Sequence, residues 1–127
     1  MNWIDEVNFN EEGLVPVIVQ DVKTSRVLML GWANREALES TVATGRGVYF
    51  SRSRGQVWCK GESSGNHQVV VGMQLATDGQ SVIYRVDPQG GVASRTGHAS
   101  YYWRELVPGG WRECEPVVRA PEDMYEK

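Results

Sequence analysis

Two short apolar segments near the start of the chain are separated by a polar one. Apolar side chains dominate Leu14–Gln20 and Val27–Trp32, whereas the intervening residues Asp21–Arg26 are polar and favour a turn. Short apolar runs bounded by turn-forming residues are typical of β-strands. The pattern therefore predicts a β-hairpin over residues 14–32.

A helix is predicted directly after this hairpin. Asn34 belongs to the residue types that cap helix N-termini, Glu36 lies in the expected first turn, and Gly45 favours a helix end. The apolar positions expected to face the core are Ala37, Leu38 and Val42.

The rest of the chain returns to short strand-like runs. Turn-forming segments at residues 78–79, 88–91 and 108–110 separate the later runs. Because the strands follow one another without intervening helices, we expect an α+β fold, a mainly antiparallel β-sheet with one main helix, in a single domain of residues 1–127. The predicted strands are Val48–Ser51, Gln56–Cys59, Gln68–Leu75, Val82–Val86 and Tyr101–Leu106.

Length and composition narrow the function classes. The chain has 127 residues, with 13 basic and 16 acidic side chains and a net charge of −3, so it lacks the charge of a general nucleic-acid binder. Mean hydropathy is −0.40, and no apolar run reaches membrane-spanning length, so no membrane partner is expected. No secretory signal is visible at the N-terminus, and Cys59 and Cys114 lie far apart, which favours a cytoplasmic location. The polar segment Pro116–Lys127 is expected to run along the surface.

Arginine and serine alternate in the segment Ser51–Arg54. If this segment is a strand, Arg52 and Arg54 point to one face and Ser51 and Ser53 to the other. Two guanidinium groups on one face suit a phosphate group. An edge strand that carries arginines against aggregation explains the same pattern.

Two further segments have the composition of ligand-binding loops. Trp58, Lys60 and Glu62 fall at strand alternation before the polar loop 63–68, which offers hydroxyl and backbone N–H groups to an anion. The glycine-rich stretch 89–100 adds further polar side chains, among them His98. An ordinary hairpin turn and a long connection with a structural histidine are the alternative interpretations.

Together these segments resemble phosphoribosyl-AMP cyclohydrolase, the zinc enzyme of histidine biosynthesis. The resemblance rests on SRSRGQVWCKGESSGNHQ, TDG and QGGVASRTGHASYYWRE, with GLVPVIVQDVKTSRVLMLGWANREAL matching the family's N-terminal hairpin and helix. It runs from about Phe9 to about Tyr125. It implies hydrolytic opening of the adenine ring of a phosphoribosylated AMP by a homodimer. It also implies zinc held by three cysteines from both subunits and magnesium held by aspartates.

The metal motifs are where the sequence departs from the family. The family's Asp-Cys-Asp-x-Asp stretch corresponds to Ala76–Gln80, so Thr77 stands at the first cysteine position. Ser94 and Tyr101 stand at the other two cysteine positions. Hydroxyl and phenol groups do not replace zinc thiolates, so no metal ligands and no cofactor are expected, and zinc least of all. Asp78 alone is a weak magnesium site.

The resemblance also implies a retained pocket for a phosphorylated, nucleotide-like small molecule. Candidate substrate-binding residues are Arg52, Ser53, Arg54, Trp58, Lys60, Ser64, Gly65, Thr96 and Gly97. Candidate catalytic residues are Asp78, His98 and Glu62 for proton transfer, with Arg95 to stabilise negative charge.

The leading hypothesis is a divergent, cyclohydrolase-like enzyme with chemistry altered by the loss of the zinc ligands. Three alternatives remain open: the family reaction retained by an unusual metal or metal-free route, a non-catalytic nucleotide-binding or regulatory protein, and a structural role in a larger complex. A homodimer is expected, with Tyr101 near the subunit contact.

Overall fold

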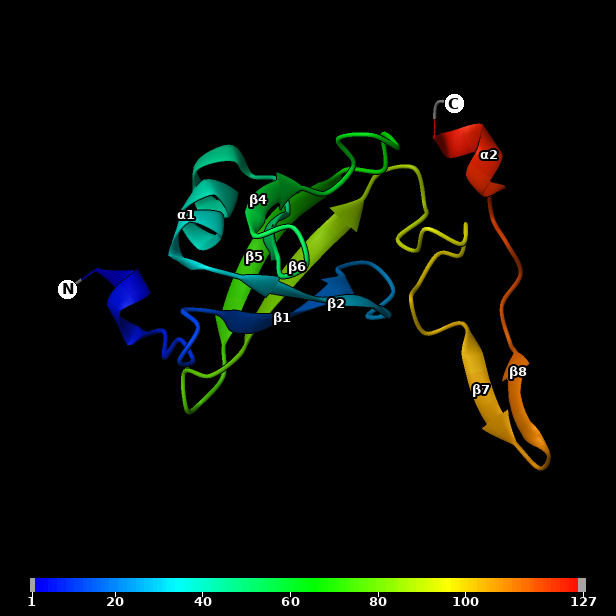
Figure 1. Cartoon of the computed structure of the whole chain (residues 1–127), viewed down its shortest axis with the longest axis horizontal. Coiled ribbons are helices and arrows are strands. Elements are labelled where there is room, and N and C mark those ends of the chain that lie inside the picture. The colour runs from blue at the N-terminus through cyan, green and yellow to red at the C-terminus, as the bar shows by residue number, and fades with distance from the viewer. Residues whose placement is uncertain (1, 126–127) are drawn as a thin grey trace.

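The computed structural model describes residues 2–125 and confirms the α+β class (Figure 1). No helix in this part of the chain is long and apolar enough to cross a membrane. The elements in chain order are a 3₁₀ helix η1 (Trp3–Glu6), β1 (Val15–Asp21), β2 (Val27–Ala33), α1 (Arg35–Thr44), β3 (Val48–Ser51), β4 (Gln56–Cys59), β5 (Gln68–Leu75), β6 (Val82–Pro88), β7 (Arg104–Val107), β8 (Gly110–Glu113) and α2 (Pro121–Met124).

The main sheet has four strands in the order β2-β1-β6-β5. The β1–β2 and β5–β6 pairs are antiparallel, and the central β1–β6 pair is parallel. Alternate residues of the two central strands are fully buried, as Val17 and Val19 on β1 and Tyr84 on β6 show. This alternation places one face of the sheet in the core.

Helix α1 covers the buried face of the sheet and begins and ends where the sequence predicts (Figure 1). The Asn34 side chain accepts a hydrogen bond from the Ala37 N–H at 2.8 Å, and Gly45 ends the helix with a φ of 71°. The predicted apolar face is wrong at one position, because Val42 is 57% exposed. Thr41 is buried instead, and its hydroxyl donates to the Ala37 carbonyl oxygen at 2.9 Å within the helix.

The β3–β4 hairpin corrects the predicted alternation of the two arginines. Strand β3 ends at Ser51, which pairs with Gln56, so residues 52–55 form the turn and have no strand alternation. The Arg52 guanidinium lies over the Trp32 ring, 4.5 Å from its centroid. The Nε–H of the Arg54 guanidinium donates to the Ser51 hydroxyl at 3.4 Å. The two guanidinium groups therefore contact different residues.

The C-terminal part differs most from the expectation. The predicted strand Tyr101–Leu106 begins instead at Arg104, and it pairs with β8, which the sequence analysis missed. Figure 1 shows the β7–β8 hairpin and α2 at the opposite end of the molecule from η1. Of the predicted surface tail 116–127, residues 121–124 form α2 and Met124 is buried, whereas residues 126–127 lie outside the described part.

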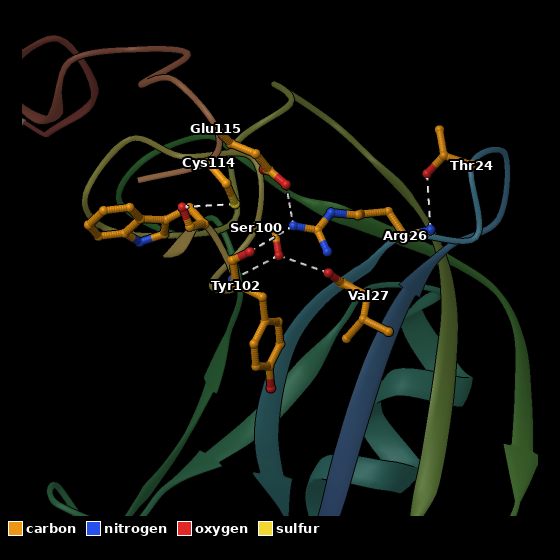
Figure 2. A network of polar contacts seen from close by, with 8 residues as sticks. Thr24, Arg26, Val27, Ser100, Tyr102, Cys114 and Glu115 are labelled. Carbon is orange, nitrogen blue, oxygen red and sulfur yellow. Dashed lines mark hydrogen bonds and ion pairs between the residues drawn. The ribbon is translucent and has the colours of Figure 1, made fainter. Parts of the chain in front are cut away.

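A polar network attaches this C-terminal part to the β1–β2 hairpin (Figure 2). The Arg26 guanidinium donates to the Tyr102 carbonyl oxygen at 2.8 Å and forms an ion pair with Glu115. The Ser100 hydroxyl donates to the Val27 carbonyl oxygen at 2.8 Å and accepts from the Tyr102 N–H at 3.0 Å. These contacts fix the position of the intervening Tyr101, whose N–H donates to the Leu28 carbonyl oxygen.

Candidate functional site

A polar cavity of about 410 Å³ lies between the β3–β4 hairpin, the turn that follows β4, and the C-terminal part of the chain. Segments distant in sequence meet there, because Arg95, Tyr101 and Tyr125 face the hairpin across the cavity. Its lining residues are Ser51, Ser53, Arg54, Trp58, Cys59, Lys60, Gly61, Glu62, Ser63, Ser64, Arg95, Tyr101 and Tyr125. Basic, hydroxyl and aromatic groups dominate this lining, which suits an anion attached to a ring.

The turn after β4 is held in one conformation by its backbone. The Cys59 N–H donates to the Glu62 carboxylate at 2.7 Å, and the Lys60 N–H donates to the Gly47 carbonyl oxygen at 2.9 Å. Gly61 has a φ of 93°, and a Cβ there would lie 2.6 Å from the His67 backbone nitrogen. The predicted strand alternation of Trp58, Lys60 and Glu62 is therefore wrong beyond Cys59, where β4 ends.

The Lys60 side chain is buried in the cavity wall. Its Nζ donates to the Ala93 carbonyl oxygen at 2.5 Å and lies 5.8 Å from the Trp58 ring centroid and 5.7 Å from that of Tyr101. Burial, followed by the positive charge of Arg95, lowers the pKa of Lys60 to about 8. The cavity thus contains an amine that is partly neutral just above physiological pH.

Two other ionisable side chains of the cavity have a raised pKa, whereas that of Lys60 is lowered. Burial, with the nearby Glu62 carboxylate, raises the pKa of the Cys59 thiol, so this thiol stays protonated and weakly nucleophilic at neutral pH. Burial also raises the pKa of the Tyr101 phenol, which keeps it a hydrogen-bond donor. The Arg95 guanidinium lies over the Tyr125 ring, 5.3 Å from its centroid.

The structure brings some of the predicted site residues into the cavity and leaves others outside its lining. Inside are Ser53, Arg54, Trp58, Lys60, Ser64, Glu62 and Arg95. Outside are Arg52, Gly65, Thr96, Gly97, His98 and Asp78. Asp78 lies in the β5–β6 turn, where its carboxylate accepts from the Gln80 N–H at 2.9 Å and its carbonyl oxygen accepts from the Asn8 side chain. These contacts organise the turn.

Thr96 and His98 belong to a separate chain of hydrogen bonds. The Thr96 hydroxyl lies 2.7 Å from the Ser94 hydroxyl and 2.7 Å from Nδ1 of His98. Nε2 of the buried His98 faces the Glu113 carboxylate at 3.5 Å. Gly97 is needed for packing, because a Cβ there would lie 2.0 Å from the Arg119 carbonyl oxygen.

Sequence reasoning missed several lining residues. Tyr125 was expected in a surface tail, and Ser51, Cys59 and Gly61 were not among the candidate site residues. A signal for this segment is present in the sequence, because the methionine at position 124, next to Tyr125, suggests a packed segment in an otherwise polar stretch.

Comparison with known proteins gives a consistent result. The family model described as phosphoribosyl-AMP cyclohydrolase matches residues 29–103. A phosphoribosyl-AMP cyclohydrolase from Stutzerimonas stutzeri is 47% identical over 98% of this chain and 95% of its own length. Proteins of the same name from Nitrosococcus oceani and Pseudomonas fluorescens are 43% and 46% identical over 98% of this chain, covering 95% and 93% of their own lengths. On these matches, the chain belongs to the phosphoribosyl-AMP cyclohydrolase family.

Proposed function

We propose that the chain binds a phosphoribosyl, nucleotide-like molecule in the polar cavity and acts on it as a divergent, cyclohydrolase-like hydrolase. The observation that carries this proposal is the lining itself, where Arg54, Lys60 and Arg95 meet the aromatic ring of Trp58. A phosphate is bound most strongly by such charged donors, and a purine-like ring stacks on an aromatic side chain. Names of the relatives support the same substrate class.

Within this proposal, Arg54 holds the phosphate and Trp58 contacts the ring. Trp58 is pre-positioned because its ring also packs on Tyr49 of the core, with ring centroids 5.4 Å apart. The hydroxyls of Ser53 and Ser64 add neutral hydrogen-bonding groups to the lining. Glu62 has one carboxylate oxygen bound by Cys59 and the other available to the ligand.

The donor set does not fit the zinc site of the family. The resemblance in sequence puts Thr77, Ser94 and Tyr101 at the positions of its three cysteines, and a threonine, a serine and a protonated phenol are poor zinc ligands. We therefore propose that the altered chemistry relies on side chains of the cavity and not on zinc.

We also propose that the chain forms a homodimer through the outer face of the main sheet. Ile18, Leu30 and Ile83 are cross-strand neighbours on that face, opposite the buried side of β1. Leu30 is 43% exposed. A row of aliphatic side chains across three strands is a surface that a second copy would bury.

The test is binding and turnover of phosphoribosyl-AMP with and without a chelator. We expect binding by calorimetry, and we expect ring opening, followed by ultraviolet absorbance, to persist in the chelator. Arg54→Ala should weaken binding by about 10-fold or more, because it removes charge-assisted hydrogen bonds worth roughly 1.5–3 kcal/mol. The matched control is Arg112→Ala, which removes the same charge from the exposed strand β8.

Each other outcome selects a different function. Turnover that the chelator abolishes would mean that the family reaction is retained with a metal. Binding without any product would indicate a nucleotide-binding or regulatory protein. Absence of binding, or equal binding by both arginine variants and the unmodified protein, would contradict the proposed site.

A further inference from the structure

Lys60 differs from Lys23, the other lysine that the structure describes. The sequence contains three lysines, Lys23, Lys60 and Lys127. Lys60 is only 8% exposed and lines the cavity, whereas the Lys23 side chain is 72% exposed and forms an ion pair with Asp87. Long charged side chains usually keep their head group in water, so a buried ammonium group in a cavity is an arrangement that needs a reason.

The groups around Lys60 do not neutralise its charge. Its Nζ contacts one carbonyl oxygen, that of Ala93, and faces the rings of Trp58 and Tyr101. None of the ion pairs among residues 2–125 includes Lys60. The charged neighbour that acts on it most is the Arg95 guanidinium, which is also positive. A salt-bridging, structural role is therefore not supported by its surroundings.

We propose that Lys60 is the proton-transfer residue of the cavity, a neutral amine that takes a proton from water as the water oxygen bonds to the substrate carbon. The resulting ammonium then returns one proton to the ring nitrogen that departs when the carbon–nitrogen bond breaks. One water molecule is consumed, and Lys60 ends as the neutral amine. The substrate in this inference is taken from the proposed function. The reactivity of the Lys60 amine does not depend on that function.

The geometry and the acidity of Lys60 agree with this role. A neutral amine keeps two N–H groups. One of them donates to the Ala93 carbonyl oxygen, and the nitrogen lone pair remains available to accept a proton. Burial and Arg95 bring the pKa to about 8, so both protonation states are populated near neutral pH. A proton-transfer group works best when its pKa lies near the working pH, and buried lysines are suited to this.

Other titratable groups of the site are less suited to the task. The Glu62 carboxylate, which lines the same cavity, is engaged by the Cys59 N–H. The Cys59 thiol and the Tyr101 phenol both have raised pKa values and hold their protons. His98 lies outside the lining, between Thr96 and Glu113.

A substrate-independent test uses pyridoxal 5′-phosphate, a phosphorylated aldehyde that forms an imine with neutral amines and is fixed by borohydride. At pH 7.5, Lys60 has a much larger neutral fraction than an exposed lysine of ordinary pKa near 10.4, so we expect labelling at least about 10-fold faster than at Lys23. Peptide mass spectrometry separates the sites, including the N-terminal amine. Inorganic phosphate should slow the labelling of Lys60 and leave that of Lys23 unchanged.

The activity test uses Lys60→Arg, with Lys23→Arg as the matched control. Arginine keeps the positive charge but does not release its proton, so binding of phosphoribosyl-AMP should change little while turnover falls by about 10²-fold or more. Lys23→Arg should match the unmodified protein. Circular dichroism of each variant verifies folding, and the labelling of the unmodified protein remains decisive where a variant does not fold.

The outcomes separate this inference from the proposed function. Labelling of Lys60 no faster than that of Lys23 would overturn the role of Lys60, whatever the substrate. Turnover by Lys60→Arg with an unchanged pH profile would also overturn it. Fast labelling of Lys60 without binding of phosphoribosyl-AMP would support the reactive amine and contradict the proposed substrate.

Discussion

The imidazole ring of His98 lies flat against the indole of Trp103, with ring centroids 3.9 Å apart and ring planes 4° from parallel. His98 is also held by the Thr96 hydroxyl, and its other ring nitrogen faces Glu113 on β8. On the same indole, the Arg104 guanidinium lies 5.3 Å from the ring centroid. This stack therefore joins the glycine-rich loop 89–100 to the start of the β7–β8 hairpin.

We expect Trp103→Leu to lower the free energy of unfolding by about 0.5–1.5 kcal/mol beyond its loss of buried area, because leucine keeps an apolar group but removes the stack. The matched control is Trp111→Leu on β8, since Trp111 is 67% exposed. Urea unfolding followed by circular dichroism measures both. Equal stability of the two variants would show that the stack contributes nothing specific.

Local sequence patterns were sufficient to predict most of the core. Strands β3, β4 and β5 have the predicted bounds, since each is a short run of β-forming residues between turn-forming ones. Helix α1 was predicted from a cap at each end. The parallel β1–β6 pairing was not predicted, because it joins residues about 65 positions apart and depends on how the whole sheet assembles.

The errors come from contacts that a local pattern does not contain. Thr41 replaces Val42 in the core because its hydroxyl finds a buried partner within the helix. Strand β8 is flanked by glycine and faces solvent, so it lacks the apolar alternation that identifies a strand. Arg52 and Arg54 separate because the hairpin turns at residue 52, a consequence of its register with β4.

The sequence indicated several residues of the candidate site but not how they are arranged in space. Trp58, Lys60 and Arg95 were selected from the resemblance to the family's motifs, and all three line the cavity. Tyr125 reaches the cavity through α2 and the packing of Met124, which no short motif encodes. The burial of Lys60 likewise depends on Ala93 and Tyr101, which lie far along the chain.

Gly61 is the residue of the turn after β4 that tolerates substitution least. Its φ is 93°, and an added Cβ would lie 2.6 Å from the His67 nitrogen, so Gly61→Ala forces the backbone to shift. We expect a loss of about 2–4 kcal/mol in unfolding free energy and a loss of ligand binding. Gly65→Ala is the control, because Gly65 also has a positive φ, 80°, but has open space around it.

That control variant should lose only about 1–2 kcal/mol, the cost of a left-handed conformation alone. Thermal unfolding and calorimetric binding measure the two effects separately. If both alanine variants lose the same stability and affinity, the close approach of Gly61 to His67 is not what shapes the turn.

The proposed subunit contact predicts that Leu30→Asp yields a monomer. A carboxylate in the middle of the aliphatic row formed with Ile18 and Ile83 would have to be buried without a partner charge, which strongly disfavours association. Leu106→Asp is the control, since Leu106 is 65% exposed on the β7–β8 hairpin. Sedimentation velocity gives the mass of each variant. A monomeric Leu106→Asp with a dimeric Leu30→Asp would move the interface to the hairpin.

The buried amine of Lys60 predicts how stability changes with pH. Its pKa in the folded protein is about 8, below the ordinary value of 10.5, so the unfolded chain binds more protons between these two values. The contribution of Lys60 to the free energy of unfolding therefore rises as pH increases from about 8 to 10.5, and it is lowest below pH 8. Lys60→Met removes the titrating group, and the stability of the unmodified protein relative to this variant should increase over that window by on the order of 1–3 kcal/mol.

Comparison of the two curves removes the effects of other titrating groups. Tyrosines such as Tyr84, whose pKa burial raises to about 12, affect both proteins equally. Any change in packing caused by the methionine shifts the unfolding free energy of Lys60→Met by the same amount at every pH. Urea unfolding at pH 7, 8, 9 and 10 measures the difference, with Lys23→Met as the control that should run parallel to the unmodified protein. If the stability of Lys60→Met also changes with pH in parallel with that of the unmodified protein, the pKa of Lys60 does not differ between the folded and the unfolded chain.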